Sequence, residues 1–222
     1  MSSTGLSSWL GKNVNYNEAW RVQNQLARSI FDGNSSNTLL FLEHSPVYTV
    51  GRRFLENHLL KALGAPLVHT DRGGQVTYHG PGQLVCYPLI LLSDTGLGPK
   101  SFVSVLEFCL IDVMQYLGIK AWTEEGLTGI WTVRGKVAAV GIKITKGVTT
   151  HGFALNINPD LIAFDSIIPC GIRGRDVTSL FALTGKVFDT ENIRNLLTSA
   201  LSFRLGIVWS ERFVCSLDDL LK

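Results

Sequence analysis

The 222-residue sequence is 45% hydrophobic and 17% charged, enough apolar content to bury the core of a single domain spanning residues 1–222. Its net charge of +2 is too small to indicate a nucleic-acid or membrane surface, and no apolar stretch is long enough to span a bilayer. The four cysteines lack the spacing of a disulfide framework or a zinc site, which favours a reducing intracellular compartment. Residues 1–16 make a poor signal or transit peptide.

The first part of the chain predicts one long helix and several short elements. Apolar residues at helical spacing follow the cap candidates Asn15 and Asn17, and this helix should end near Gly33. The other elements expected here are strands over 38–42, 47–50 and 66–69 and a short helix over 55–63 that stops at Gly64.

The rest of the chain alternates strands with two amphipathic helices. Strands are expected over 75–78, 84–92, 136–144 and 151–158, and helices over 101–117 and 190–205. A capping box of Ser104 and Glu107 is predicted for the first of these helices. The last two strands should form a hairpin around the Lys146-Gly147 turn. Hairpins with helices before, between and after them predict an α+β fold in which helices pack against a sheet.

One lysine and one cysteine are the candidate reactive groups. Cys170 lies between a proline that fixes φ and a glycine that permits unusual dihedrals, so its loop could expose the sulfur. Lys136 is a candidate cation that would favour the thiolate and carry its proton. The alternatives are a buried, inert cysteine and a solvated lysine at a strand end.

Several glycines and two histidines are further candidates for the site. The segment 71–88 is rich in turn residues, and Gly73-Gly74 would allow close backbone approach to a ligand. Gly141 and Gly152 lie inside strands, where a missing side chain indicates that a ligand or another backbone comes close. The segment matches neither a Walker A pattern nor GxGxxG, and no His/Cys/Asp spacing predicts a metal. His79 and His151 alone are more often structural hydrogen-bonding residues.

Four blocks of sequence carry a resemblance to a known family. They are RGGQVTYHGPGQLV at 72–85, KVAAVGIKI at 136–144, THGFALNIN at 150–158 and IPCGI with VTSL at 168–180. Together they resemble the signature blocks of lipoyl(octanoyl) transferases, over most of residues 38–180. The resemblance implies a single domain with the mixed, largely antiparallel α+β fold of the biotin and lipoate protein ligases.

The resemblance also implies a mechanism and its partners. Members take an octanoyl group from octanoyl-acyl carrier protein and pass it to a lysine of lipoyl domains, in 2-oxoacid dehydrogenase E2 subunits and glycine cleavage H protein. Cys170 would be the acyl-accepting nucleophile and Lys136 its acid/base partner. No cofactor, metal or ATP would be needed, and the chain would act as a monomer, in the mitochondrial matrix if eukaryotic or the cytoplasm if bacterial.

The family blocks also predict a binding pocket for the acyl chain. Its expected residues are Arg72, Gly73, Gly74, Gln75, Val76, Thr77, Tyr78, His79, Ala139, Val140, Gly141, His151, Gly152, Phe153 and Ala154. Two other functions remain open. An ATP-dependent lipoate or biotin protein ligase shares the fold but needs no cysteine nucleophile, and a non-catalytic module would only bind carrier proteins or lipoyl domains.

Overall fold

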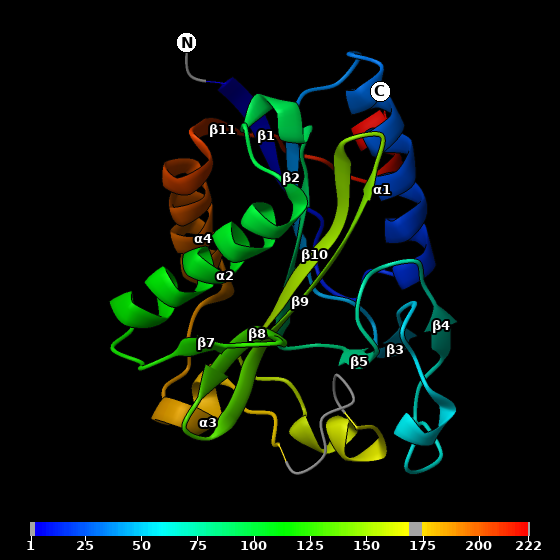
Figure 1. The fold of residues 1–222 in the computed structure, drawn as a ribbon, viewed down its shortest axis with the longest axis vertical. Coiled ribbons are helices and arrows are strands. Elements are labelled where there is room, and N and C mark those ends of the chain that lie inside the picture. Colours follow the sequence, from blue (N-terminus) through cyan, green and yellow to red (C-terminus); the bar gives the residue numbers. More distant parts are fainter. Residues whose placement is uncertain (1–2, 169–174, 222) are drawn as a thin grey trace.

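The structure is a computed structural model that describes residues 3–168 and 175–221. Figure 1 shows its helices and strands. In chain order these are β1 (Ser3–Trp9), α1 (Tyr16–Phe31), β2 (Thr38–Leu42), β3 (Val47–Val50), η1 (Glu56–His58), β4 (Leu67–His69), β5 (Val76–His79), β6 (Gln83–Leu89), η2 (Leu92–Asp94), α2 (Pro99–Tyr116), β7 (Trp122–Glu124), β8 (Leu127–Thr132), β9 (Gly135–Thr145), β10 (Val148–Asn156), η3 (Leu161–Ser166), α3 (Leu180–Thr184), α4 (Thr190–Leu205), β11 (Ile207–Glu211) and η5 (Leu217–Leu221).

A large mixed sheet organises these elements. Its eight strands follow the order β11-β1-β2-β6-β10-β9-β8-β7, and a separate sheet contains three strands in the order β4-β3-β5. In the large sheet β1 pairs in parallel with both β2 and β11, while the other pairs are antiparallel. The prediction of an α+β fold with a mixed, largely antiparallel sheet is therefore confirmed.

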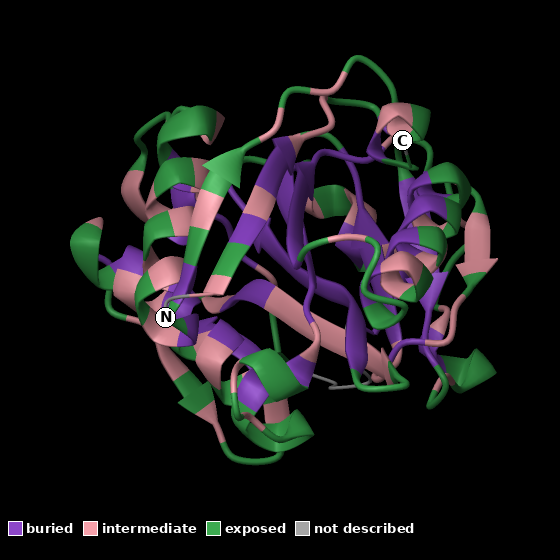
Figure 2. Ribbon diagram, turned by 90° about the horizontal axis from the view of Figure 1, so that it is seen from above, coloured by how far each residue is buried: buried purple, intermediate pink, exposed green. Residues whose placement is uncertain are grey.

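Helices cover both faces of the large sheet. One apolar core lies between the sheet and the helices α2 and α4, and a second lies between the sheet and α1 (Figure 1). Because both faces are covered, β2 and β6 are buried at every position and read as nearly continuous apolar runs. Figure 2 shows this arrangement from above, with buried strands in the middle and exposed residues on the outer sides of the helices.

The small sheet forms its own apolar cluster below the large one. Tyr48 and Tyr78 pack there against Phe164 of η3, with the Tyr78 and Phe164 rings edge to face. The chain passes from this cluster into β5 and then β6, so the small sheet holds the segment 72–79 against the large sheet. This placement forms the pocket described below.

The helix ends follow from capping residues. The Asn15 side chain accepts hydrogen bonds from the backbone amides of Asn17 and Glu18, which confirms one of the two predicted cap candidates of α1. Asp189 caps α4, and Gly206 ends it with a φ of 68°, a conformation that favours glycine. The predicted helix bounds of 190–205 are therefore confirmed.

Two local predictions are wrong. Residues 55–63 do not form a helix but contain only the short η1 turn, because their backbone pairs with another segment: the Leu60 amide bonds to Ser166 and the Ile168 amide bonds to His58. The capping box in α2 is also absent, since this helix already begins at Pro99 and Ser104 lies inside it. Glu107 instead accepts a hydrogen bond from the Gly129 amide of β8.

Two strands at one edge of the large sheet were not predicted. β1 and β11 join residues from opposite ends of the sequence in a parallel pair, and no local turn signals such a pairing. Across the described ranges 3–168 and 175–221, no helix combines the length and the apolar character needed to cross a membrane.

Candidate active site

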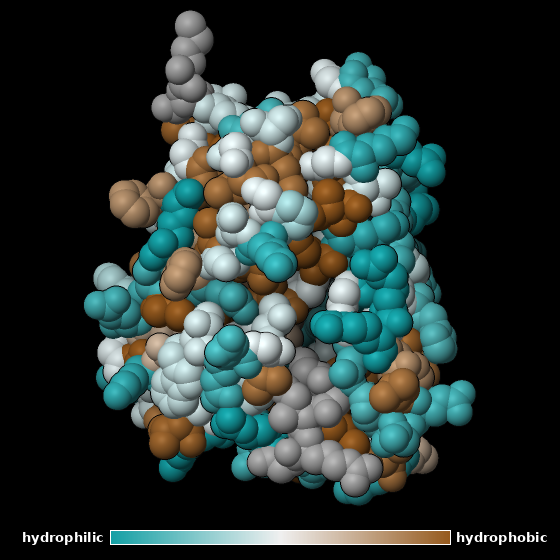
Figure 3. Space-filling view, viewed as in Figure 1, coloured by the Kyte–Doolittle hydropathy of each residue, from teal (hydrophilic) through white to brown (hydrophobic). Residues whose placement is uncertain are grey.

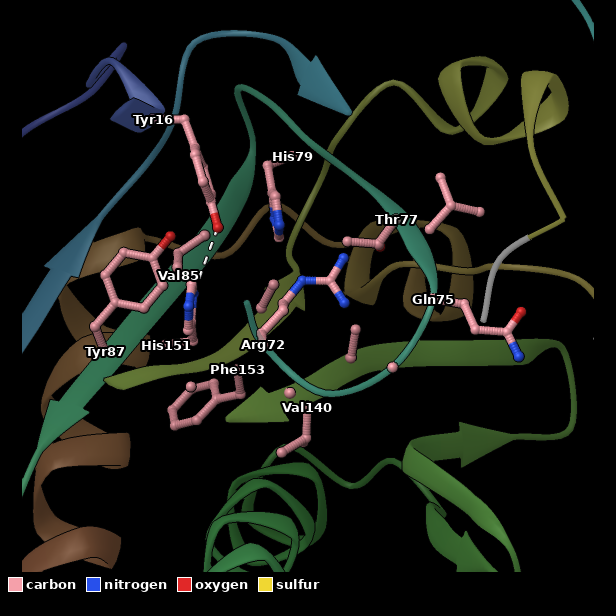
Figure 4. A pocket seen from close by; sticks show the side chains of 16 residues that line it. Tyr16, Arg72, Gln75, Thr77, His79, Val85, Tyr87, Val140, His151 and Phe153 are labelled. Atoms are coloured by element: carbon pink, nitrogen blue, oxygen red, sulfur yellow. Dashed lines mark hydrogen bonds between the residues drawn. The ribbon is translucent and has the colours of Figure 1, made fainter. Parts of the chain in front are cut away.

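A pocket lies between the β9–β10 hairpin and the segment that leads into β5. Side chains from β5, β6, β9 and β10 point into it, and Tyr16 reaches it from the start of α1 (Figure 4). Its cavity volume is about 50 Å³, measured to the centre of a water-sized sphere. One water needs roughly 10–15 Å³ on that scale, so the pocket has room for several heavy atoms in a row.

Most of the predicted pocket residues do lie on the pocket wall. The lining residues that the sequence indicated are Arg72, Gly74, Gln75, Val76, Thr77, His79, Ala139, Val140, Gly141, His151, Gly152, Phe153 and Ala154. Gly73 lies beside the wall, and its amide donates to the Ile142 carbonyl. Tyr78 points to the other side of β5, because neighbouring strand residues face opposite ways, and it packs with Tyr48 and Phe164.

The two strand glycines allow close backbone approach rather than leaving empty space. A Cβ at Gly152 would lie 2.1 Å from the Cys86 carbonyl oxygen, and one at Gly141 would lie 3.2 Å from that of Gly73. Of the two predicted reasons for these glycines, the approach of another backbone is therefore the one that the structure supports. Gly152 lets β10 pair with β6, and Gly141 lets the 72–74 segment close over β9.

Three histidines and two tyrosines lie close together at the pocket, where ring contacts and two separate hydrogen-bonded pairs connect them. Tyr87 donates its hydroxyl to His44 Nε2 over 2.6 Å, and His44 Nδ1 donates to the Val14 carbonyl over 2.9 Å. Tyr16 and His151 approach within 3.4 Å, as the dashed line in Figure 4 shows. The hydrogen-bonding interpretation of His79 and His151 is thus the one the geometry supports.

Burial keeps these histidines neutral. Desolvation lowers the pKa of His44 to about 4 and that of His79 to about 3, and it also lowers the pKa of His151. His79 Nδ1 donates to the Gln83 side-chain oxygen over 2.7 Å, because the Gln83 amide nitrogen is already used as a donor to Asn156. Burial also raises the pKa of Tyr16 to about 12, so both tyrosine and histidine side chains stay uncharged at neutral pH.

Asp71 ties the loop over the pocket to the β9–β10 hairpin. Its carboxylate accepts from His151 Nε2 over 2.9 Å and from Lys143 Nζ over 2.7 Å. The His151 hydrogen bond is the largest cause that holds the pKa of Asp71 well below its usual range, and Lys143 adds to it. Neutral His151 then accepts a hydrogen bond from the Tyr16 hydroxyl at Nδ1 and donates one to Asp71 from Nε2, which gives a consistent chain of donors from Tyr16 to Asp71.

Lys136 is buried, which contradicts the interpretation as a solvated strand-end residue. Only 4% of the residue is exposed, and its Nζ donates to the Thr128 carbonyl over 2.6 Å. The Nζ also lies 5.2 Å from the centre of the Trp131 ring. Moving a lysine side-chain nitrogen out of water costs free energy of solvation, and contacts such as these offset that cost.

Lys136 borders a small cavity that lies between two larger ones. This small cavity is bordered by Lys136, Asn156 and Gln83, and it shares Thr77 and Ala139 with the pocket described above. On its other side this cavity shares Phe164 and Val177 with a wide surface hollow. The lysine therefore stands between an inner apolar pocket and the outside of the molecule.

Cys170 lies outside the described residues, so its distance to Lys136 is untested. The described residues on either side of its segment, Ile168 and Arg175, both line the surface hollow. The three other cysteines are not reactive candidates by position: Cys86 and Cys109 are buried in the core, and burial raises the pKa of each thiol. Cys215 is exposed near the end of the chain.

Sequence reasoning missed Tyr16, Val85 and Tyr87 as pocket residues. Val85 and Tyr87 lie on one face of β6, and alternation along this strand could have grouped them. Nothing in the apolar run of residues 84–92 shows which of its two buried faces meets a pocket. Tyr16 comes from a distant helix start, and only the folded chain brings it to the pocket.

The surface above the pocket is divided by polarity. Seen as in Figure 1, hydrophilic residues cover the side over α1, and apolar residues gather where β9 and β10 cross the middle of the face (Figure 3). In the part of the chain that the structure describes, no group of three His, Cys, Asp or Glu side chains has the geometry to hold a metal ion. What the described residues offer is a mainly apolar pocket next to a small cavity that Lys136 borders.

Comparison with known proteins assigns this fold and pocket to a family. Residues 15–202 match the family model described as the lipoyl protein ligase A/B catalytic domain. The octanoyltransferase of Chloroflexus aggregans is 43% identical over 198 residues, which cover 85% of this chain and 89% of that protein. The octanoyltransferase of Mycobacterium tuberculosis strain H37Rv is 44% identical over 191 residues, covering 85% of this chain and 82% of that protein.

The chain therefore belongs to the lipoyl protein ligase A/B catalytic domain family. Within this family it groups with the octanoyltransferases, and it is an acyltransferase.

Solved structures agree on the fold at much lower identity. A putative lipoate protein ligase from T. acidophilum with bound lipoic acid has a TM-score of 0.75 at 18% identity, covering 98% of this chain and 92% of that one. The biotin protein ligase from Aquifex aeolicus in complex with biotin and ATP has a TM-score of 0.58 at 17% identity, covering 90% of this chain and 70% of that one. At such identity the similarity establishes a shared architecture.

Proposed function

We propose that this acyltransferase moves an octanoyl group from octanoyl-acyl carrier protein to the lipoyl-domain lysine of 2-oxoacid dehydrogenase E2 subunits and of glycine cleavage H protein. Cys170 carries the group as a thioester, and Lys136 acts as the acid and base. The reaction needs neither ATP nor metal, because the donor thioester already holds the energy for transfer. The chain works as a monomeric domain spanning residues 1–222, in the bacterial cytoplasm or the mitochondrial matrix.

The transfer has two acyl-exchange steps. In its neutral amine form Lys136 takes the proton of Cys170, and the thiolate attacks the carbonyl carbon of the carrier thioester. The carrier sulfur leaves and receives the proton from Lys136, so that one thioester replaces another. The neutral amine of the target lysine then attacks the octanoyl-enzyme, an amide bond forms, and the Cys170 sulfur leaves. The amine's surplus proton passes through Lys136 to solvent or to the cysteine.

The position of Lys136 is the observation that carries this proposal. Its side-chain nitrogen is buried, and Lys136 borders a small cavity that shares wall residues with the apolar pocket; a thioester carbonyl would lie near it if the acyl chain filled the pocket. The described residues next to the cysteine segment, Ile168 and Arg175, line the hollow on the outer side of this small cavity.

The wall of the pocket suits an alkyl chain. Val76, Ala139, Val140, Phe153 and Ala154 give it an apolar lining, and neutral histidines and tyrosines complete the wall together with Arg72, whose guanidinium donates to Thr49. Removing an eight-carbon chain from water into such a pocket stabilises binding by roughly 0.8 kcal/mol for each buried methylene group. The tail therefore enters from the Lys136 side, and its methyl end lies toward Tyr16.

Two other functions would give different results in the same assay. The fold is shared with ATP-dependent ligases, such as the biotin protein ligase crystallised with biotin and ATP. A ligase would act on free acid and ATP and would not need Cys170. A binding module would hold a carrier protein or lipoyl domain without forming any covalent adduct.

Intact-protein mass spectrometry tests the proposal directly. The protein is mixed with octanoyl-acyl carrier protein without ATP, as wild type, Cys170→Ser and Lys136→Ala. We expect one octanoyl adduct on the wild type, none on Cys170→Ser, and slow adduct formation on Lys136→Ala. Adding a lipoyl domain should discharge the adduct and increase the mass of the domain by one octanoyl group.

Several outcomes would contradict this function. A wild type that forms no adduct, but modifies the lipoyl domain when given ATP and free octanoate, would be a ligase. Free octanoate without modified lipoyl domain would indicate a thioesterase. Cys215→Ser serves as a matched control, because this exposed cysteine lies outside the pocket and should leave the adduct unchanged.

A further inference from the structure

A carboxylate on α2 reaches the strand beside Lys136. Glu107 lies half-buried in the middle of this helix, and its Oε1 accepts a hydrogen bond from the Gly129 amide over 2.8 Å. A surface helix carboxylate has no need of such a partner, since water solvates it well. The one other acidic residue of the helix, Asp112, pairs with an arginine side chain instead, so the backbone contact of Glu107 calls for its own physical reason.

The amide that donates a hydrogen bond to Glu107 belongs to the same peptide group whose carbonyl accepts from Lys136. The peptide bond between Thr128 and Gly129 presents its carbonyl to Lys136 Nζ over 2.6 Å and its N–H to Glu107. An anion at one end of a peptide dipole and a cation at the other polarise it in the same sense, so each hydrogen bond strengthens its neighbour. Glu107 and Lys136 thus form an ion pair that is bridged by one peptide group.

Local backbone geometry places this peptide group at the lysine. Gly129 has a φ of 119°, and a Cβ there would lie 2.4 Å from Lys136 Cε, so the lysine chain crosses directly over the glycine. The pairing of β8 and β9 shifts register between Ile130 and Trp131, which is where a bulge turns the strand. Once Gly129 is fixed by Glu107, the Thr128 carbonyl points at the lysine.

The charges around Glu107 agree with this arrangement. Burial raises the pKa of Glu107, while the Gly129 hydrogen bond and the positive charge of Lys136 oppose that rise. Other charged groups of this region are already paired: Asp112 on α2 binds Arg204 of α4, and Glu124 of β7 binds Arg175.

We propose that Glu107 is a positioning residue for Lys136 and acts through the Thr128–Gly129 peptide group. The carboxylate orients this peptide so that its carbonyl holds the lysine nitrogen at the small cavity between the apolar pocket and the surface hollow. This inference rests on the proposed role of Lys136 as acid and base. Glu107 itself lies behind the strand and touches no substrate.

Three variants separate the hydrogen bond from the charge. Glu107→Gln keeps an oxygen that accepts from Gly129 but removes the charge, and Glu107→Leu removes both. Asp112→Asn is the matched control, because it removes a carboxylate from the same helix whose partner is Arg204. All are compared as full-length protein for the rate of octanoyl adduct formation and for the concentration of octanoyl-acyl carrier protein at half-maximal rate.

We expect the rate constant to fall while the half-saturating concentration stays within about twofold. A reactive group displaced by about 1 Å can lose about 100-fold in rate, so Glu107→Leu should be slower by roughly 30-fold to 100-fold. Glu107→Gln should recover most of that loss, to within about tenfold of wild type, because it keeps the acceptor. Asp112→Asn should react at the wild-type rate. An equal rate for Glu107→Leu and wild type would overturn the inference.

A second measurement does not depend on catalysis. An amine-reactive reagent, added in a short pulse, labels accessible lysines, and peptide mass spectrometry reports the label on Lys136. We expect about tenfold faster labelling in Glu107→Leu than in wild type, with Lys12 as an internal standard, because the released side chain reaches solvent more often. Unchanged labelling of Lys136 would refute the positioning role even in a protein that forms no adduct. A missing adduct in wild type would count against the proposed function instead.

Discussion

The two ends of the pocket hold polar groups in opposite ways. At the far end, Tyr16 bonds to His151 and Tyr87 to His44, and burial keeps the histidines neutral. At the near end, Lys136 is a buried cation that bonds to the backbone and stands beside an opening to the surface. An end lined by neutral rings suits recognition of an inert alkyl tail, whereas an end with a buried lysine nitrogen suits proton transfer.

The largest expected effect comes from removing the charge at the near end. Lys136→Met keeps an unbranched side chain of similar length but cannot carry a proton. Acid–base catalysis by a side chain contributes roughly 10²-fold to 10⁴-fold, so adduct formation should slow by that factor. Rapid-quench mass spectrometry measures the rate, and circular dichroism checks the fold. A rate within about threefold of wild type would mean that the near end is not the reactive one.

The neutral far end should make the fold sensitive to acid. His44 has a folded-state pKa of about 4 against about 6.5 when unfolded, so its contribution to stability is fully present above pH 6.5 and is lost as the pH falls toward 4. The loss at pH 4 should be ~3 kcal/mol from this residue alone. Urea unfolding between pH 7 and 4 measures it. His69→Gln, at an exposed position, should leave the pH slope unchanged.

A smaller effect should follow when one far-end donor is removed. Tyr87→Phe leaves His44 Nε2 buried without the hydroxyl that now lies 2.6 Å away. An unsatisfied buried acceptor costs about 1–3 kcal/mol, so the free energy of unfolding should fall by that amount at pH 7. Chemical denaturation tests this value. If stability is unchanged, the far-end network does not hold the pocket together as a unit.

The smallest expected effect is a change of chain-length preference. Tyr16→Ala removes the ring that closes the far end and should admit longer acyl chains. One added methylene in an apolar pocket is worth about 1–3 kcal/mol, so the ratio of nonanoyl to octanoyl transfer should rise by about tenfold or more. The two acyl groups, each loaded on acyl carrier protein, compete in one reaction, and mass spectrometry measures the ratio of the two products. Tyr16→Phe keeps the ring and should leave the ratio close to wild type.

The sequence predicted the near end of the pocket better than the far end. The β9–β10 hairpin has short apolar runs and a clear turn, so its two strands follow from local pattern, whereas the family resemblance indicated Lys136 and the pocket residues on this hairpin. The far end depends on Tyr16 and Tyr87, which come from separate elements, and no local rule shows that they meet. His79 and His151 were candidates, but their neutral state follows from burial, which only the folded chain defines.

Two of the errors in secondary structure have a common physical cause. Residues 55–63 were predicted as a helix from local composition, but their backbone bonds to residues 166–168, more than a hundred positions later. The strands β1 and β11 were missed because a parallel pair between the two ends of the sequence leaves no local signal. In each case a long-range pairing determined the structure, and single-sequence patterns do not report such pairings.

The parallel pair of β1 and β11 has a consequence for the order of assembly. β1 binds β2 on one side, but its other side stays open until residues 207–211 have been synthesised. During translation, β1 therefore keeps an unpaired strand edge until almost the whole chain has been synthesised. Such an edge is a known starting point for aggregation. Closing so distant a contact is entropically slow, and addition of the last strand should be a late event in folding.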